Sequence, residues 1–355
     1  MSISRRGLLA AGLTVAAVGA MGVVSTMNAR ADDTPVVVES DPTQTPPALL
    51  PSGKVPRPVV MGEPGSSSAA LAAAGASAAK DVVEPGSDAT AFAPKGESGQ
   101  ITTSTTDVAP PLPPTLKAPG PDEVGYAYSG GRQYAVTEGA SGTLTIANPR
   151  LGSNDWHSLA ELAVSTRDDD GNPFQAVEVG WTVDPTTFGD ADNPQPHLFV
   201  YHWVNGQESC YGCGFVPLLS SSVKVGSIPA VGAKFFGLMH ANGAWWIAYD
   251  TEYIGSFPDS LWNGRFTRSG LVQGFGEVAY PKAQGQPCSQ MGNGHAPANP
   301  ADANAAKISS WSYNNGPAVQ ISLINPLNVV PPAPYPNFPI LDSVRSVRYG
   351  GTVNC

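Results

Sequence analysis

The chain has 355 residues and a formal net charge of −10, with 14% charged residues, 39 glycines and 35 prolines. The negative charge repels phosphate backbones, which argues against nucleic acid as a partner. Few charges combined with much glycine and proline argue against long exposed helices and favour short strands joined by turns.

The first 31 residues are predicted to be an export signal. Ser4-Arg5-Arg6-Gly7-Leu8-Leu9 is a twin-arginine pattern, an apolar run over residues 7–27 follows, and Ala29-Arg30-Ala31 offers a small-x-small cleavage site. The apolar run contains several glycines, which suits a cleaved twin-arginine signal better than a membrane anchor. We therefore expect a secreted product with no membrane partner after removal of residues 1–31.

Residues 32–120 are predicted to be a low-complexity segment. They are rich in proline, alanine, serine, threonine and glycine, and every tryptophan, tyrosine, cysteine and histidine of the chain lies after them. Such a segment buries too little apolar surface to offset chain entropy, so we expect it to be disordered. Two roles are open for it: a flexible linker, and a pro-segment that is removed on maturation.

Residues 121–355 have the pattern of a β-rich domain. Residues 134–147 are predicted as two strands around a glycine-containing turn, and residues 158–165 as either a helix or a strand. Further apolar strands, rich in β-branched or aromatic residues, are predicted at residues 175–183, 197–204, 234–240, 244–249 and 271–280.

Two dipeptides between these runs, Asn205-Gly206 and Asn242-Gly243, are strong signals for tight hairpin turns. Many strands with short turns and few helices predict an all-β fold. We expect an antiparallel β-sandwich of two stacked sheets, of the jelly-roll or lectin-like kind.

The four cysteines, Cys210, Cys213, Cys288 and Cys355, are an even number in a chain expected to be exported, which favours disulfides. The Cys210-Tyr-Gly-Cys213 motif is also compatible with a redox dithiol or half of a zinc site, although no second CxxC is present. The pairing we favour is a local Cys210–Cys213 bond and a long-range Cys288–Cys355 bond. We expect no metal and no cofactor.

The common hydrolase signatures are missing from the sequence, which has no GxSxG, no HExxH and no P-loop motif. His197 and His202 lie five positions apart on one predicted strand, so their side chains lie on opposite faces and cannot share a metal ion. A Ser-His-Asp triad is compatible with any spacing, but nothing in the sequence points to one.

Two glutamates inside apolar strands are the better candidates for chemistry. Glu178 lies between two valines, and Glu277 lies between a glycine and a valine. Small residues near each glutamate would leave room for a substrate backbone to approach. The alternative is that each glutamate faces solvent from a half-exposed sheet, as single glutamates in strands usually do.

Three stretches of the sequence resemble the C-terminal domain of the neprosin family. Residues 178–190 are similar to the family pattern E-x-G-W-x-V-x-P-x-x-x-G-D, Gly274-Phe-Gly-Glu-Val278 is similar to G-G-E-V, and Gln290-Met-Gly-Asn-Gly-His295 is similar to Q-M-G-S-G-H. The order and spacing of the three motifs make a chance similarity improbable.

This resemblance implies a β-sandwich whose concave face carries two catalytic glutamates, Glu178 and Glu277. It also implies peptide cleavage in acid, after proline in the family's best-studied member. Two nearby carboxyl groups that hold one proton between them supply a base for water and an acid for the leaving nitrogen. This sequence departs from the plant pattern in the closer spacing of Cys210 and Cys213, in the extra Cys288 and in its N-terminal region.

The cleft around the two glutamates is predicted to include residues that stack on a proline ring or hydrogen-bond to an oxyanion, with core or loop packing as the alternative. These candidate substrate-binding residues are Trp181, Tyr201, Gln290 and His295. Asp184 and Asp190, in contrast, are expected to fix turns.

Two other functions remain open at this point. One is a glycoside hydrolase that uses the same carboxyl pair, with Trp181 and Trp203 stacking on a sugar. The other is a non-enzymatic, lectin-like surface-binding module on a proline-rich stalk. The peptidase hypothesis has a peptide or protein as its substrate, and we expect the protein to be a monomer.

Overall fold

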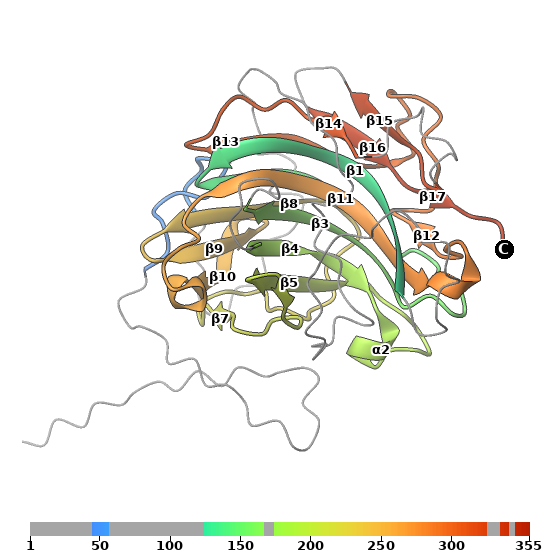
Figure 1. Ribbon diagram of the computed structural model, residues 1–355, viewed down its shortest axis with the longest axis horizontal. Coiled ribbons are helices and arrows are strands. Elements are labelled where there is room, and N and C mark those ends of the chain that lie inside the picture. Colours follow the sequence, from blue (N-terminus) through green and yellow to red (C-terminus); the bar gives the residue numbers. More distant parts are fainter. Residues whose placement is uncertain (1–44, 57–123, 167–173, 325–333, 341–344) are drawn as a thin grey trace, which may run out of the picture.

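The computed structural model describes residues 45–56, 124–166, 174–324, 334–340 and 345–355. The predicted export signal and most of the low-complexity segment lie outside these residues. The described part is almost entirely antiparallel β-structure in two stacked sheets, which confirms the all-β prediction (Figure 1). In that part of the chain, every helix is too short or too polar to cross a membrane.

The first sheet has seven strands in the order β14-β1-β11-β3-β4-β5-β6. Their bounds are β1 Val124–Thr137, β3 His157–Ser165, β4 Ala176–Val183, β5 His197–Val204, β6 Gln207–Glu208, β11 Ser269–Pro281 and β14 Ser322–Leu323. β1 and β11 are long curved strands that lie side by side, and β3 lies between β11 and β4 (Figure 1).

The second sheet has eight strands in the order β15-β16-β13-β2-β8-β9-β10-β7. Their bounds are β2 Gly139–Ile146, β7 Val216–Pro217, β8 Gly232–Ala241, β9 Ala244–Tyr249, β10 Glu252–Pro258, β13 Ala306–Asn314, β15 Asn337–Ile340 and β16 Ser346–Tyr349. Short elements complete the described fold: the pair β12 Gln290–Met291 with β17 Gly351–Thr352, the α-helix α2 Pro185–Phe188, and the 3₁₀ turns η3 Asp259–Trp262 and η4 Lys282–Gln284.

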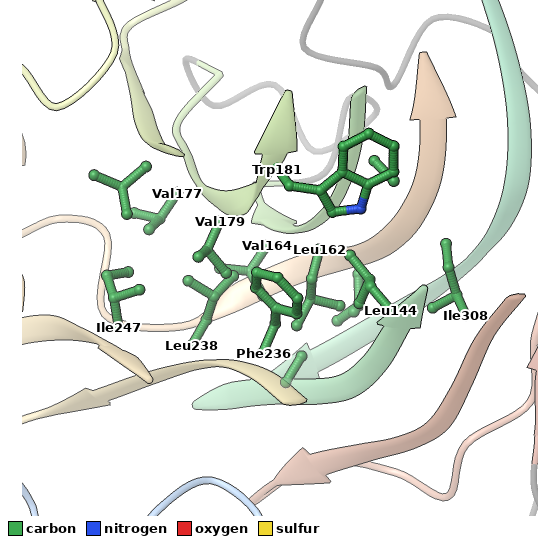
Figure 2. Close-up of a cluster of buried hydrophobic side chains, with 14 of the residues drawn as sticks. Leu144, Leu162, Val164, Val177, Val179, Trp181, Phe236, Leu238, Ile247 and Ile308 are labelled. Carbon is green, nitrogen blue, oxygen red and sulfur yellow. The ribbon is translucent and has the colours of Figure 1, made fainter. Parts of the chain in front are cut away.

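The main hydrophobic core lies between the two sheets. Side chains alternate along each strand, so one face of β3 and β4 supplies apolar residues that meet those of β2, β8, β9 and β13. Figure 2 shows this contact, with Leu162, Val164, Val177, Val179 and Trp181 from the first sheet and Leu144, Phe236, Leu238, Ile247 and Ile308 from the second. One face of the seven-stranded sheet packs against this core, so a functional site on this sheet would lie on its opposite face.

Both predicted hairpin turns are confirmed. Asn205 and Gly206 have φ of 52° and 75° between β5 and β6, and Asn242 and Gly243 have φ of 53° and 78° between β8 and β9. Positive φ at both central residues is the type I′ geometry that matches the twist of paired strands.

Two strand predictions are settled by the sheet pairing. Residues 158–165, left open as helix or strand, lie in β3 and pair on both sides with β4 and β11. Residues 134–147 do contain two strands, but the break falls at Glu138 and the strands do not pair with each other. β1 pairs with β11 in the first sheet and β2 pairs with β8 in the second, so this break is a corner between sheets.

A short part of the low-complexity segment is packed against the eight-stranded sheet. The Leu50 side chain is buried with Trp246 and Tyr253, on the side of β9 and β10 away from the main core. The Tyr253 hydroxyl donates to the Leu49 carbonyl over 2.6 Å, and the side-chain amide of Asn242 donates to the Thr45 carbonyl over 2.8 Å. Residues 45–56 are therefore part of the folded structure.

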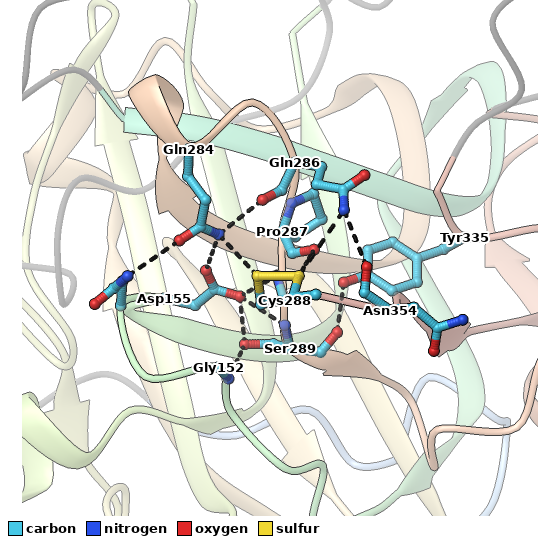
Figure 3. The surroundings of a disulfide bond; sticks show 11 residues. Gly152, Asp155, Gln284, Gln286, Pro287, Cys288, Ser289, Tyr335 and Asn354 are labelled. Carbon is cyan, nitrogen blue, oxygen red and sulfur yellow. Dashed lines mark hydrogen bonds between the residues drawn. A yellow bond between two sulfur atoms is a disulfide. The ribbon is translucent and has the colours of Figure 1, made fainter.

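Two disulfides join the four cysteines in the predicted pairs, Cys210–Cys213 and Cys288–Cys355. Beside the second bond, the buried Asp155 carboxylate accepts hydrogen bonds from the backbone amides of Cys288 and Ser289 (Figure 3). This network ties the loop before β3 to the C-terminal end of the chain.

Candidate active site

Three glutamates lie on one face of the seven-stranded sheet. Glu277 on β11 is opposite Leu159 of β3, and Glu178 on β4 is opposite Ala163 of β3. Side chains alternate between the two faces of a strand, so those of Leu159, Glu161 and Ala163 lie on the same face of β3. Glu161 therefore shares a face with both predicted glutamates. We call this surface, defined by Glu161, Glu178 and Glu277 and directed away from the eight-stranded sheet, the carboxyl face.

Glu161 lies midway between the other two glutamates. Standard strand spacing places the Cα atoms of Glu178 and Glu277 roughly 10 Å apart across the sheet and roughly 13 Å apart along it. Glu161 is opposite both Phe275 and Gly180, which makes it a diagonal neighbour of each of the other glutamates. The sequence alone does not reveal Glu161, because the face to which its side chain belongs can be assigned only once residues 158–165 are known to form a central strand.

The side chains of all three glutamates are fully buried, each with 0% exposure. Burying ionised carboxylates is costly, and neighbouring carboxylates repel each other. Within the described residues, no group of three or more His, Cys, Asp and Glu side chains is arranged to hold a metal ion.

The two predicted catalytic glutamates have different hydrogen-bond partners. Glu277 Oε1 lies 2.8 Å from Nε2 of His157, and the side chains of both residues have 0% exposure. Glu178 Oε1 accepts a hydrogen bond of 3.1 Å from the indole N–H of Trp203. An ionisable base thus contacts one glutamate, whereas a neutral donor contacts the other.

Tyr128 adds a hydroxyl group to the carboxyl face. It lies on β1 directly opposite Glu277, and its hydroxyl oxygen is buried. Burial raises the pKa of Tyr128 well above its ordinary value, and the nearby Glu277, Tyr126, Glu161 and Glu178 raise it further. The hydroxyl group therefore stays protonated and remains a hydrogen-bond donor throughout the acid and neutral range.

Residues 154–330 match the family model described as Neprosin. This chain belongs to the Neprosin family. The matched range contains His157 and all three glutamates of the carboxyl face. Membership of the family supports a peptidase function.

Among solved structures, a scytalido-glutamic peptidase with a peptide-based transition-state analogue is similar to this chain at a TM-score of 0.35 and 10% identity, over 65% of this chain and 100% of that one. SCP-B, an Eqolisin-family peptidase in complex with a tripeptide, has a TM-score of 0.32 with the same identity and coverage. A glycoside hydrolase family 16 endo-glucanase from Bacteroides ovatus has a TM-score of 0.28 at 10% identity, over 45% of this chain and 69% of that one. Likeness at these TM-scores carries no argument about function.

Of the four predicted substrate-binding residues in this Neprosin domain, Tyr201 lies on the carboxyl face. It is opposite Glu178 in the register of β4 and β5, and its hydroxyl group donates to the Ser209 carbonyl over 2.8 Å. Its ring packs with Trp203 and Tyr211, so an aromatic group borders Glu178.

Trp181 lies on the opposite face of the Neprosin sheet, which corrects its assignment to the cleft. It is three residues from Glu178, and an odd separation along a strand reverses the side. Its indole ring is fully buried in the main core, and its N–H donates to the Thr145 carbonyl over 3.1 Å (Figure 2). Trp181 is therefore not part of the proposed site.

Gln290 and His295 lie in the C-terminal part of the domain, and no described contact joins either side chain to the glutamates. Gln290 Oε1 accepts from the Arg150 amide over 2.9 Å. The half-exposed His295 contacts Asp302 over 2.9 Å. The backbone amide of Ala298, followed by His295, lowers the pKa of Asp302 to about 2.

Asp184 and Asp190 fix turns, as predicted. The Asp184 carboxylate caps α2 by accepting from the Thr187 amide over 3.0 Å. The Asp190 carboxylate accepts from the Gln195 amide over 2.8 Å and contacts His197 over 3.1 Å. Both belong to the turn that joins β4 to β5.

Gly180, two residues from Glu178, is required for the packing of β4 against β3. The sequence had instead led us to expect that small residues near Glu178 leave room for a substrate. A Cβ atom on Gly180 would overlap the Ala160 carbonyl and lie 2.8 Å from the Glu161 Cα atom. We predict that Gly180→Ala forces β3 and β4 apart and lowers the free energy of unfolding by about 1–3 kcal/mol. Chemical denaturation measures this loss.

Gly142→Ala is the matched control. A Cβ atom on Gly142, in β2, would lie 3.3 Å from its nearest neighbour, the Ser309 carbonyl oxygen. An equal loss of stability in the two variants would contradict the packing explanation for Gly180.

Proposed function

We propose that this protein is a secreted glutamic endopeptidase that hydrolyses peptide bonds in acid, with Glu178 and Glu277 as its acid–base pair. The observation that carries the proposal is that the glutamates of two separate motifs, far apart in sequence, lie on one face of one sheet with a third carboxyl group between them. Membership of the Neprosin family supports peptide bonds as the target.

The chemistry needs one ionised and one protonated carboxyl group. The ionised group takes a proton from water as the water oxygen bonds to the carbonyl carbon, and the protonated group gives its proton to the nitrogen as the C–N bond breaks. The hydroxyl group of Tyr128, which stays protonated beside Glu277, is a suitable donor to the oxyanion.

The carboxyl pair predicts a bell-shaped dependence of the rate on pH, centred in the acid range. Activity falls at low pH when the base binds a proton, and it falls at high pH when the acid has lost its proton. The two apparent pKa values belong to the coupled cluster as a whole.

The complete burial of the three carboxyl groups in the full chain bears on the role of residues 32–120. A substrate can reach these groups only after whatever covers them moves away. Of the two roles left open for this segment, we propose the pro-segment, with the full chain latent until part of that segment is removed.

Cleavage after proline is part of the same proposal. Tyr201 and Trp203 place aromatic rings beside Glu178, and an aromatic ring is a suitable surface for a proline ring. Export through the twin-arginine signal would bring the enzyme to peptide substrates outside the cell.

The test incubates the full chain from pH 2 to pH 8 with a denatured, proline-containing protein and, in parallel, with a β-glucan. We expect loss of residues from the 32–120 segment, seen by N-terminal sequencing, followed by peptide cleavage in acid, with the cuts mapped by mass spectrometry. Glucan cleavage without peptide cleavage would support the glycoside hydrolase instead. No peptide cleavage at any pH, even after N-terminal trimming, would refute the proposal.

A further inference from the structure

We propose that the outer face of the eight-stranded sheet carries a second peptide-binding site, separate from the carboxyl face, for proline-rich apolar peptides. In the full chain, residues 45–56 occupy this site (blue in Figure 1). The inference concerns binding alone and does not depend on the proposed peptidase activity.

The part of the sheet that contacts residues 45–56 is apolar and largely aromatic. Side chains alternate along β8 and β9, so the residues between those that enter the main core face outward. Gly237 on β8 is opposite Ala248 on β9, and Ala248 is opposite Tyr253 on β10, so two small residues lie in a row with a tyrosine. We call this part of the sheet the outer surface, and it consists of Phe235, Gly237, Trp246, Ala248 and Tyr253.

The side chains of residues 45–56 that are buried are Pro47, Leu50 and Pro51. Leu50 is only 3% exposed and packs in one apolar cluster with Trp246. Pro51 lies directly over Gly237, because a Cβ atom on that glycine would be 2.8 Å from the Pro51 Cγ atom. The missing side chain of Gly237 thus leaves the space that a proline ring fills.

The polar contacts of the sheet with this segment are made to backbone carbonyl groups. The Tyr253 hydroxyl donates to the Leu49 carbonyl, and the side-chain amide of Asn242 donates to the Thr45 carbonyl. The Leu49 side chain is 45% exposed, so this contact recognises the backbone and leaves the side chain free to vary. A proline-rich segment offers mainly carbonyl groups, since proline has no backbone N–H, and aromatic surfaces are a common way to bind such segments.

The segment is shaped by a turn of its own. The Leu50 amide donates to the Lys54 carbonyl over 2.7 Å, and the Gly53 amide donates to the Leu50 carbonyl over 2.8 Å. Gly53 has a φ of 77°, which suits a glycine in a turn. Because these bonds lie within residues 45–56, a separate peptide of this sequence can form them. The segment can therefore bind as a peptide, without its covalent link to the domain.

Loss of this segment on maturation would uncover the outer surface. Trp246 and Tyr253 would then face solvent, and an exposed apolar patch of this kind is typical of a binding site. The outer surface is directed away from the seven-stranded sheet, so it lies on the opposite side of the sandwich from the carboxyl face. Under the proposed function, the processed peptidase would hold a proline-rich stretch of its protein substrate there.

The test titrates a fluorescent peptide of residues 45–56 with the full chain and follows the fluorescence anisotropy. Leu50→Asp in the chain should empty the outer surface, because burying a carboxylate there is costly. We expect saturable binding to the Leu50→Asp chain. Binding to the parent should be at least about ten-fold weaker, since its tethered copy competes at a high effective concentration. Mass spectrometry of the recovered peptide separates binding from cleavage.

Variants of the outer surface, made in the Leu50→Asp chain, test the contacts one by one. Tyr253→Phe removes the donor to a peptide carbonyl and should weaken binding by about three- to ten-fold. Gly237→Ala places a methyl group where the Pro51 ring lies and should also weaken binding. Tyr249→Phe is the matched control, because Tyr249 lies on the core side of β9, and it should leave binding unchanged.

A peptide with both Pro47→Ala and Pro51→Ala tests the class of ligand. It should bind about ten-fold more weakly, because alanine loses more backbone freedom on binding than proline does. Equal binding of the two peptides would overturn the preference for proline-rich segments.

Two results would overturn the site itself. One is no saturable binding of the parent peptide to the folded Leu50→Asp chain up to about 1 mM. The other is binding that Tyr253→Phe and Gly237→Ala both leave unchanged. If Leu50→Asp abolishes the cooperative thermal unfolding of the chain, Leu50→Ala takes its place in the same titration. Absence of peptide cleavage in the earlier test would refute the proposed function and leave this inference standing.

Discussion

Replacing either Glu277 or Glu178 by glutamine is expected to lower kcat for peptide cleavage by about 100- to 10,000-fold, the usual contribution of a general acid or base. Glutamine has nearly the same shape and can still hydrogen-bond to His157 or Trp203, but it neither takes a proton from water nor supplies one to nitrogen. The fold should be retained, because the change removes a buried acidic group without changing its volume.

Steady-state rates at the optimum pH measure this effect, with Glu138→Gln as the control. Glu138 is partly exposed and lies at the corner where β1 ends and β2 begins, away from the part of β1 that borders the carboxyl face. Its replacement should therefore leave kcat unchanged. Full activity in either Glu178→Gln or Glu277→Gln would refute the pair as proposed. Activity retained in Glu178→Gln but lost in Glu161→Gln would transfer the role of Glu178 to Glu161, which lies closer to Glu277 in the register.

Lowering the pH from 6.5 to 4 is expected to cost roughly 3 kcal/mol of folding stability through His202 alone. Burial lowers the pKa of His202 from 6.5 to about 4, with a hydrogen bond to the Cys213 backbone acting weakly in the opposite direction. Between these values the unfolded chain binds a proton at His202 and the folded chain does not, so unfolding becomes more favourable as the pH falls. Each pH unit in this window is worth about 1.4 kcal/mol.

Urea denaturation at pH 6.5 and at pH 4 measures the loss, and His202→Phe should remove most of the His202 contribution. The ring of His202 packs against Phe257 and Trp262 on the core side of β5, so phenylalanine suits the site. The same pH dependence in the parent and in His202→Phe would exclude His202 as its source. His202 is thus expected to destabilise the fold in the acid range, where the proposed peptidase activity is expected.

Much of the local structure of this protein was determined by the sequence itself. The Asn-Gly dipeptides produced the two hairpins because both residues tolerate positive φ. Alternating apolar runs became strands, and the disulfide pairs followed from the number and placement of the cysteines. The two glutamates were found through motifs around them, and their placement on one sheet agrees with that hypothesis.

Only the tertiary structure decided which residues surround those glutamates. Glu161 and His157 are recognised as neighbours of the two glutamates only because β3 lies between β4 and β11. This strand order depends on pairings between segments far apart in the chain. The tertiary structure also decided that the Trp181 side of β4 faces the main core. It placed β1 and β2 in different sheets, with the break at Glu138. Local patterns specify strands and turns through short-range sterics, but the choice of neighbouring strand and of buried face depends on how the apolar surface of the whole domain is covered.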